Sequence, residues 1–401
     1  MMLRFLTAGE SHGPSLTAIL EGMPAGLLLR PADLQADMQR RQKGYGSGGR
    51  MGIEKDRVRI TGGVMGGQTT GGPIALYVEN RDWVNWRDKD VPPMTVPRPG
   101  HADLTGAIKY GYRDLRLALE RASARETAAR VAVGAVCRCL LAEFGIVIGS
   151  YVVSIGQVVA SVPPLAGDSA PEAYRARFET AEGNEVRCPD LQAAEQMHQA
   201  IFEAMQAKDT LGGIFEVVAL GVPPGLGSFV HWDRRLDARL LWAVGSIHAV
   251  KGVEIGTAFE NAGLRGTQLH DEIFIDQHEG VSRLTRQTNR AGGLEGGITT
   301  GQPVVIRGAM KPISTTLTPL RSVDLASGQP ATTLYERSDF CAVPRAAVVG
   351  EAMVAFVLAD ALIEKIGGDS LAEMRTRFTA LRTGRLDELP MDGAPWQLGY
   401  E

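Results

Sequence analysis

The sequence has few cysteines and no long uninterrupted run of apolar residues. A membrane-spanning helix needs about 20 consecutive apolar residues, and even the segment 346–359 is interrupted by Glu351. Residues 1–14 lack the apolar stretch of a secretory signal. The cysteines form no CxxC pair and show no metal-ligand spacing; they are Cys137, Cys139, Cys188 and Cys341. We therefore expect reduced thiols, no metal site, no membrane partner and a cytoplasmic location.

Aromatic residues and positive net charge are also scarce. Aromatics make up 6% of the chain, and the formal net charge is −4. Nucleic-acid-binding proteins usually present a basic surface with aromatic stacking platforms, so we expect no nucleic-acid partner. The sequence also lacks a Walker-type phosphate loop and a dinucleotide-binding glycine turn. Its 44% hydrophobic and 22% charged residues are typical of a globular protein with a full core.

Arginine is locally dense against this mildly acidic background. Such local cationic density suits a small polyanion better than a long one. An ordinary solvated surface with ion pairs, such as Glu126 with Arg130, is the alternative. One group of arginines flanks a glycine-rich loop and another follows His101; they are Arg40, Arg41 and Arg50, then Arg113, Arg116, Arg121, Arg125 and Arg130.

The 48 glycines are clustered, and two of the clusters are similar in sequence. Residues 62–73, GGVMGGQTTGGP, and residues 292–303, GGLEGGITTGQP, share eight of twelve positions, and each precedes a strand-like segment. A weaker similarity relates 121–134 to 337–350, because both begin with arginine and run into an apolar helix-like stretch. We interpret the pairs as an internal duplication, with two halves sharing one core around a pseudo-twofold axis. Chance similarity between two glycine-rich loops is the alternative.

The spacing of apolar residues predicts a mixed α+β fold in a single domain. Helical spacing predicts helices over 115–144, 190–208 and 347–366. Segment 92–99 holds four prolines and is predicted to be a stiff extended loop. No linker separates independent domains, so we expect one domain over 1–385 and a peripheral tail over 386–401. Strands are predicted at 58–60, 74–78, 146–159, 214–220 and 304–307.

Two histidines lie in short motifs of small residues. His12 follows a short apolar strand in GESHG (9–13), and His101 ends the proline-rich loop in RPGHAD (98–103). Histidine titrates near neutral pH and therefore suits a general acid. Taken alone, a histidine in a turn such as His12 is more often structural than catalytic, and for His101 the motif favours neither interpretation.

Three further motifs offer cations and hydroxyl groups for binding phosphate or carboxylate. In RASARET (121–127), Arg121 and Arg125 are one helical turn apart and are predicted to share a face, where Ser123 can add a hydroxyl. The turn MKPIST (310–315) offers Lys311 and hydroxyls, and RSD (337–339) places an acid beside an arginine, with VPR following at 343–345. Surface ion pairs and a solvated lysine are the alternatives for each motif alone.

Taken together and in this order, the motifs resemble those of chorismate synthases along nearly the whole chain. The resemblance implies a β–α–β sandwich with internal pseudo-symmetry, assembled as a homotetramer, with reduced FMN and substrate bound side by side. It implies conversion of 5-enolpyruvylshikimate 3-phosphate (EPSP) to chorismate and phosphate by 1,4-anti elimination, the last common step of the shikimate pathway to aromatic amino acids. The segments that carry the resemblance are 9–13, 41–50, 98–101, 121–127, 251–256, 292–301, 311–315 and 337–339.

The resemblance also implies ligand contacts residue by residue. Arginine stays charged and binds oxyanions in a bidentate manner, which suits a polyanionic substrate. Two positions depart from the family: Ser47 stands where many relatives carry arginine, and His248 stands where relatives vary. The implied substrate contacts are Arg41, Arg50, Arg98 and Arg125. The implied FMN contacts are Arg121, Ala122, Ser123, His248, Ala249, Gly296, Lys311, Pro312, Ile313, Ser314, Thr315 and Arg337.

The same resemblance implies three catalytic residues. His12 would be the general acid near the leaving phosphate, His101 would protonate or hold the reduced flavin, and Asp339 would assist proton traffic near flavin N5. The cofactor carries the hard chemistry, while the protein orients it and tunes protonation. A flavin-dependent NADPH reductase using the same pocket is the rival interpretation. The sequence does not distinguish an enzyme that reduces its own flavin with NADPH from one served by a separate flavin reductase.

Overall fold

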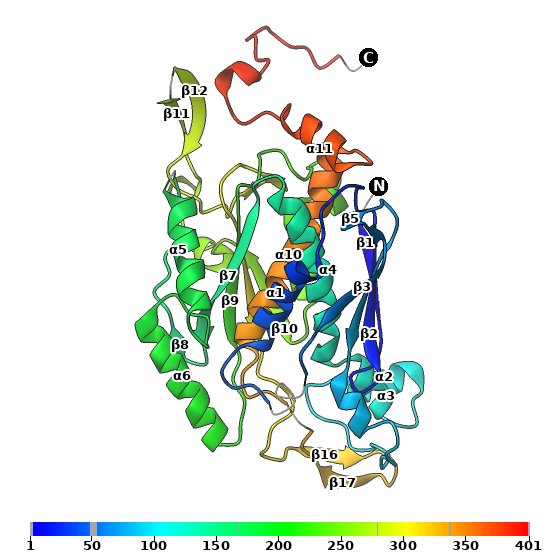
Figure 1. Ribbon diagram of the computed structural model, residues 1–401. Coiled ribbons are helices and arrows are strands. Elements are labelled where there is room, and N and C mark those ends of the chain that lie inside the picture. Colours follow the sequence, from blue (N-terminus) through cyan, green and yellow to red (C-terminus); the bar gives the residue numbers. More distant parts are fainter. Residues whose placement is uncertain (1–2, 49–53, 168, 279, 337, 400–401) are drawn as a thin grey trace.

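The computed structural model describes residues 3–48, 54–167, 169–278, 280–336 and 338–399, and its framework is two antiparallel sheets (Figure 1). In the strand β6 the alternate residues Ile74, Leu76 and Val78 are buried, as the two-residue period of a strand requires. The predicted strands at 58–60 and 74–78 are confirmed. The first sheet has the order β1 (Arg4–Ala8), β2 (Ser15–Glu21), β6 (Ile74–Glu79) and β3 (Val58–Gly62).

The second sheet is covered by helices on both faces. Helices α5 (Ala170–Glu182) and α6 (Leu191–Gln206) pack on its outer side. The single strand predicted at 146–159 is wrong, because the chain reverses at Gly156, whose φ is +56°, and forms two paired strands. The strands predicted at 214–220 and 304–307 are confirmed. The order is β10 (Val250–Ile255), β15 (Val304–Met310), β9 (Gly213–Leu220), β7 (Val147–Ile155) and β8 (Val158–Val159).

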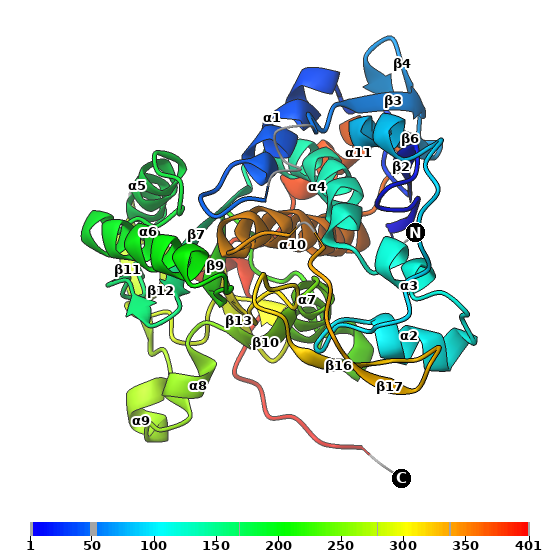
Figure 2. The ribbon, with the colours of Figure 1, turned by 90° about the horizontal axis from the view of Figure 1, so that it is seen from below.

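Two long helices lie between the sheets (Figure 2). Helix α4 (Thr127–Ala142) packs on β2 and β6, helix α10 (Val343–Ile366) packs on β7 and β9, and the two helices pack against each other. Helix α1 (Pro31–Gln42) packs on α4, and α7 (Leu236–Gly245) packs on α10. The molecule is therefore layered as sheet, helices and sheet, and the predicted α+β class is confirmed.

Among the described residues, α10 is the one helix long and apolar enough to cross a membrane by length and composition, with a mean hydropathy of 2.1. However, 94% of its most apolar window is buried inside the protein. Three charged residues of this helix, Arg345, Glu351 and Asp360, are buried with it. Helix α10 is therefore the core helix of the layered fold.

Glu351 is the hub of a buried ion-pair cluster that ties α10 to its neighbours. Its carboxylate accepts hydrogen bonds from Arg40 Nη2 at 2.6 Å and from Ser150 Oγ at 2.5 Å, and it pairs with Arg138 and Arg187. Burial alone would raise the pKa of Glu351, but the arginines, Arg40 foremost, lower it to about 2. Because the folded-state pKa lies below the ordinary value of 4.5, this stabilisation is complete above pH 4.5 and is lost as the pH falls toward 2.

Glu351→Gln is expected to lower the free energy of unfolding at neutral pH by about 3 kcal/mol, because three arginines lose their shared counter-charge. Urea denaturation of parent and variant measures the loss. The difference between the two proteins should shrink as the pH is lowered from 5 to 3, because the carboxylate becomes protonated in the unfolded parent while the folded parent, with its lower pKa, keeps it ionised. A difference that stays constant over this range would contradict the electrostatic explanation.

The long helix predicted over 115–144 is wrong in its first third. The chain forms α3 (Arg116–Arg121), a 3-10 turn η3 (Ala124–Glu126) and then α4. Ser123 separates them in an extended conformation, and its hydroxyl accepts a hydrogen bond from the backbone N–H of Arg125. A side chain that bonds to the backbone in this way competes with helical hydrogen bonding.

The other two predicted helices are confirmed. Helix α6 follows Asp190, whose carboxylate caps it by accepting from the backbone N–H groups of Gln192 and Ala193. Helix α10 begins at Val343, earlier than predicted, because Pro344 is tolerated in a first helical turn.

The predicted proline-rich loop at 92–99 contains neither helix nor strand, as expected. Beyond η5 (Leu386–Glu388), the chain to residue 399 is exposed and irregular. The remaining elements are β4 (Val64–Met65), β5 (Gln68–Thr69), η2 (Arg81–Asn85), α2 (Asp103–Tyr110), η4 (Trp232–Arg234), α8 (Ala258–Asn261), α9 (Gly266–Leu269), β11 (Ile273–His278), β12 (Val281–Arg286), β13 (Leu294–Glu295), β14 (Ile298–Thr299), β16 (Arg321–Asp324), β17 (Gln329–Thr332) and α11 (Leu371–Phe378).

Candidate active site

A cavity of about 460 Å³ lies where several loops meet beside the first turns of α4 and α10. Figure 1 shows that both helices begin toward the end of the molecule that carries β16 and β17. The positive ends of two helix dipoles therefore face one site, which favours an anionic ligand. Its ionisable lining residues include His12, His101, His248, Arg41, Arg98, Arg125, Arg345, Lys251, Lys311, Glu54, Glu336 and Asp339.

His12 is fixed in the cavity wall by a carboxylate and by contact with a tilted indole ring. Its Nδ1 lies 2.8 Å from Glu120 Oε1, its backbone N–H donates to Glu120 Oε2 at 2.7 Å, and its ring lies 4.3 Å from the ring of Trp86. Burial alone would raise the pKa of Glu120, but the hydrogen bonds from His12 lower it overall. An ionised Glu120 only accepts, so Nδ1 of His12 carries the proton of this hydrogen bond, which fixes the orientation of the ring.

His101 is held by the same kind of partner. Its Nδ1 lies 2.5 Å from Oδ1 of Asp103, which is completely buried. Arg98 donates from Nε to Asp103 Oδ2 at 2.8 Å and from Nη1 to Thr315 Oγ1 at 3.1 Å. Burial would raise the pKa of Asp103, but His101 and Arg98 lower it well below its usual range. Asp103 therefore orients both a histidine and an arginine of the cavity.

Arg41 and Arg125 share one buried carboxylate. Arg41 Nη1 donates to Asp56 Oδ2 at 2.9 Å, and Arg125 Nη1 donates to Asp56 Oδ1. Asp56 is 1% exposed and has a φ of +36°, a conformation that residues other than glycine rarely adopt. Burial, helped by the neighbouring Arg125 and Arg345, lowers the pKa of Arg41 to about 10 against the opposing effect of Asp56. Cations are thus crowded at this end of the cavity.

Asp339 lies near the same cations, ahead of α10. Its Oδ1 accepts from the backbone N–H of Gly48 at 2.8 Å, and its Oδ2 accepts from Arg345 Nη1 at 2.5 Å. A side chain at Gly48 would come within 2.5 Å of the carbonyl oxygen of Ser338, so this close approach requires glycine. The glycine loop and the start of α10 are therefore joined through Asp339.

The cavity lining also carries two lysines and a third histidine. Lys251 and Lys311 form no salt bridge with any described residue, and burial followed by the charge of Lys251 lowers the pKa of Lys311. His248 is buried, its Nδ1 has no partner among the described residues, and burial lowers its pKa to about 4. Ala249 has a φ of +64°, a strained conformation of the kind found at ligand sites.

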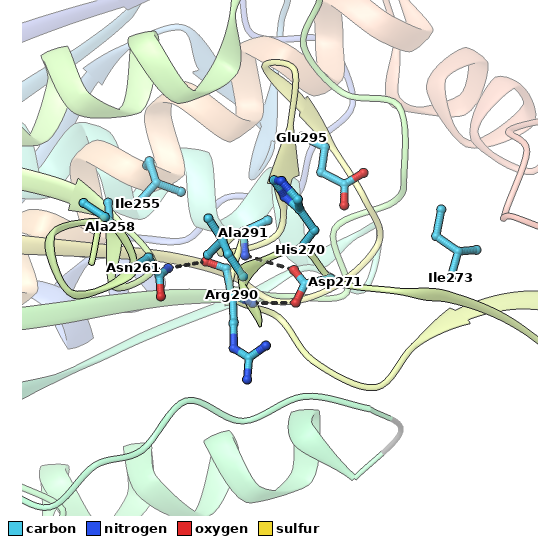
Figure 3. A pocket seen from close by; sticks show the side chains of 11 residues that line it. Ile255, Ala258, Asn261, His270, Asp271, Ile273, Arg290, Ala291 and Glu295 are labelled. Carbon is cyan, nitrogen blue, oxygen red and sulfur yellow. Dashed lines mark hydrogen bonds between the residues drawn. The ribbon is translucent and has the colours of Figure 1, made fainter. Parts of the chain in front are cut away.

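A second cavity, of about 570 Å³, lies between β10, α8, α9 and residues 290–295 (Figure 3). Asp271 lines it and accepts from the backbone N–H groups of Arg290 and Ala291, each at 2.9 Å. Asn261 donates to the carbonyl oxygen of Arg290 at 3.0 Å, while the guanidinium of Arg290 points away from Asp271. These side chains hold loops together, so the first cavity is the better candidate for chemistry.

Comparison with known proteins decides between the chemistries that such a cavity could support. The family model described as chorismate synthase matches residues 3–363. The chain belongs to the chorismate synthase family.

Curated chorismate synthases and a solved structure agree with this assignment. The enzyme of Aquifex aeolicus is 55% identical over 386 residues, covering 94% of this chain and 96% of its own. That of Desulforudis audaxviator is 55% identical over 382 residues, covering 93% and 95%. A crystal structure of a chorismate synthase is 48% identical, with a TM-score of 0.77 over 95% of this chain and 97% of that one.

The predicted activity and cofactor are thereby confirmed. Chorismate synthases are lyases of the shikimate pathway that act on EPSP, and the family uses reduced FMN. The high identity over nearly the full length of curated chorismate synthases supports this activity for the chain.

The family resemblance implies a set of catalytic and ligand-binding residues in this chain. Most of those that the structure describes line the first cavity. Three do not: Arg121, Gly296 and Pro312 are absent from its lining. Arg50 and Arg337 lie outside the described residues. Those that do line it are His12, His101, Asp339, Arg41, Arg98, Arg125, Ala122, Ser123, His248, Ala249, Lys311, Ile313, Ser314 and Thr315.

The shared helical face predicted for Arg121 and Arg125 is wrong, because the chain breaks between them at Ser123. Arg121 ends α3 and donates from Nη2 to Thr7 Oγ1 at 2.9 Å on an exposed surface. Arg125 is 7% exposed and donates from Nε to Asn80 Oδ1 at 2.8 Å. The two guanidinium groups therefore have separate protein partners.

The sequence analysis did not identify the carboxylates that position the cations and histidines of the cavity. It also did not single out Arg345 as a ligand-binding candidate. Asp103 stands in the RPGHAD motif, so its distance of two residues from His101 was an available signal. Asp56 and Glu120 stand in no motif and reach the cavity through folding alone. Ser47, the departure from many relatives, donates its hydroxyl back to the carbonyl of Gly44 and adds no charge.

Proposed function

We propose that this cavity binds EPSP beside reduced FMN and that phosphate is eliminated there. The observation that carries the proposal is the gathering of three histidines and six arginine or lysine side chains around one cavity at two helix N-termini. The substrate carries a phosphate and two carboxylates, about four negative charges in total. Arg41, Arg98 and Arg125 would supply fixed positive charge for it, together with Arg50.

The lining residues around Lys311, whose backbone N–H donates to the carbonyl of Ala249 at 2.9 Å, fit the flavin. Nδ1 of His248 is a buried polar atom without a described partner, and a neutral imidazole can either donate or accept a hydrogen bond. Lys311 lies beside Gly100, where an added side chain would meet Ser314 at 3.4 Å and Lys311 Nζ at 3.6 Å. The residues that would hold FMN are Ala122, Ser123, His248, Ala249, Lys311, Ile313, Ser314 and Thr315, with Arg337. When bound, the reduced cofactor supplies the transient electron density that the elimination needs.

The chain's own contribution to the reaction is proton control and orientation. His12 lines the cavity, is oriented by Glu120 through Nδ1, and would donate a proton to the leaving phosphate. His101, oriented by Asp103, would protonate or hold the reduced cofactor, and Asp339 would assist proton movement there. In both histidines a carboxylate fixes the orientation of the ring through Nδ1.

Lys311→Met is expected to raise the dissociation constant of reduced FMN about tenfold, because one charge-assisted hydrogen bond is lost. Anaerobic fluorescence titration of the flavin measures this change. Lys109→Met, on the exposed face of α2, is the matched control and should bind FMN like the parent. Equal affinity in all three proteins would show that Lys311 does not contact the flavin.

We also infer that the fold arose by internal duplication. The order β3-β6-β2-β1 of the first sheet corresponds to β10-β15-β9-β7 of the second. Leu20 of β2 pairs with Ile74 of β6, and Ala219 of β9 pairs with Val304 of β15, at corresponding positions. A superposition of the halves that fails to align these strands would contradict the inference.

The similar glycine clusters support the same inference. Each forms a two-stranded hairpin, β4–β5 in the first half and β13–β14 in the second. Thr69 Oγ1 donates to the carbonyl of Pro24 at 2.6 Å, and Thr299 Oγ1 donates to that of Pro223 at 2.7 Å. Matching hydrogen bonds on matching residues are hard to produce by chance similarity of two loops.

Three further proposals concern the assembly, the domain division and the location of the protein. We propose a homotetramer with one catalytic domain over 1–385 and a peripheral tail, located in the cytoplasm. Exposed aromatic residues on the second half, Trp232, Trp242 and Phe259, support association between copies. A monomer mass in light scattering would contradict the tetramer.

Reduced flavin would come from NADPH at this enzyme or from a separate flavin reductase.

A further inference from the structure

Arg345, in the first turn of α10, faces the cavity with unused hydrogen-bond donors. It is 9% exposed and lines the cavity, and its Nη1 donates to Asp339 Oδ2 at 2.5 Å. Its Nε and Nη2 have no hydrogen-bond partner among the described residues. A buried donor without an acceptor costs about 1–3 kcal/mol, so an acceptor is expected from a molecule that enters the cavity.

The two unused nitrogens lie on the same edge of the guanidinium plane. Nε–H and one N–H of Nη2 point in the same direction, and this edge matches two oxygens of a carboxylate or phosphate. Nη1, at the other side of the plane, is committed to Asp339. Arg345 can therefore bind an oxyanion side-on without releasing Asp339.

The other described arginines that line the cavity differ from Arg345, since each of their nitrogens already has a protein acceptor. Arg41 donates from its nitrogens to Asp56, Thr127 and the carbonyl of Ala124. Arg98 donates to Asp103 from Nε and Nη2 and to Thr315 from Nη1. Arg125 donates to Asn80, Asp56 and the carbonyl of Glu79. These three supply positive potential, whereas Arg345 has donors to give to a ligand.

We propose that Arg345 binds an oxyanion of the substrate side-on through Nε and Nη2 while Nη1 holds Asp339 in place. The inference rests on the proposed function of the cavity and adds to it a substrate-binding residue that also positions Asp339. The oxyanion is the phosphate or a carboxylate of EPSP, which present the same pair of oxygens to the guanidinium. Substrate binding and the orientation of Asp339 are thereby coupled through one side chain.

Arg345→Lys tests this directly, because lysine keeps the charge but cannot present two parallel donors. The dissociation constant of EPSP should rise at least about tenfold in the FMN-loaded enzyme, while the affinity for FMN stays unchanged. Arg345→Gln should weaken EPSP binding further, and thermal unfolding would show that both variants are folded. Arg234→Lys, at an exposed arginine paired with Glu364, is the matched control and should bind EPSP like the parent.

The Asp339→Asn background separates ligand binding from positioning. If Arg345 contacts the substrate, Arg345→Lys should weaken EPSP binding in this background too; an effect that vanishes there would overturn the contact. Weaker competition by inorganic phosphate in the Arg345→Lys enzyme would assign the phosphate group, and unchanged competition would assign a carboxylate. Unchanged EPSP affinity in a folded Arg345→Lys enzyme would overturn the inference while leaving the activity of the parent intact. A parent enzyme that forms no chorismate would instead defeat the proposed function.

Discussion

Replacement of His12 by asparagine is expected to lower kcat for chorismate formation about 100-fold or more, because a positioned general acid contributes roughly that much. Nδ1 of His12 lies 2.8 Å from Glu120 Oε1, which holds the imidazole in the wall of the cavity where the proposed function places the leaving phosphate. The asparagine side chain can keep a hydrogen bond, but its amide cannot act as a proton donor to the leaving phosphate near neutral pH. Anaerobic turnover with saturating EPSP and reduced FMN measures the loss.

The affinity of the His12→Asn enzyme for reduced FMN should stay at the parental value, since His12 is assigned to the substrate. His231→Asn is the matched control, because His231 is exposed and does not line the cavity. A His12→Asn enzyme with parental kcat would remove His12 from the catalytic residues. A parallel loss in the His231 variant would show that the effect is not specific to the cavity.

Replacement of His101 by asparagine is expected to lower kcat by a similar factor of about 100 or more, but through the cofactor. His101 is fixed at 2.5 Å from the buried Asp103, and the proposed function places its other nitrogen toward the reduced flavin. The variant should therefore also change the absorbance spectrum of bound reduced FMN and its dependence on pH. The His12 variant should leave that spectrum unchanged.

This spectral readout separates the two histidines. If His101→Asn retains parental activity, its assigned role is wrong. If it loses activity but binds reduced flavin with a parental spectrum at every pH, then His101 acts on the substrate rather than on the cofactor. Asp103→Ala is the companion variant, because it removes the orienting carboxylate and leaves the imidazole in place.

The regular elements were predictable because their signals are local. In β6 buried and less buried residues alternate, and in α10 apolar residues follow one another almost without interruption, so both patterns can be recognised within a short segment of sequence. The two glycine clusters were recognisable for the same reason, since glycine is needed at the positive φ angles of Gly63 and Gly293, +81° and +80°. The break before α4 was not predictable, because the sequence around Ser123 has good helix formers on both sides. The helix is interrupted there because the hydroxyl of Ser123 accepts a hydrogen bond from the backbone N–H of Arg125.

The histidines and most cations of the site were predictable from motifs, whereas their partners were not. Asp56 is distant in sequence from Arg125, and only the packing of the first sheet against α4 brings the two together. Arg345 carried a usable signal, since a charged residue at the start of a buried apolar helix needs a partner. However, only the structure shows that Nε and Nη2 of Arg345 have no hydrogen-bond partner among the described residues.

The measurement that tests the central claim most directly is an anaerobic assay with EPSP and chemically reduced FMN, following chorismate, phosphate and NADPH. The account predicts equal amounts of chorismate and phosphate, many turnovers per flavin, and no stoichiometric consumption of NADPH. Sustained NADPH oxidation without chorismate, by an enzyme that still binds FMN, would contradict it and would favour a flavin-dependent reductase.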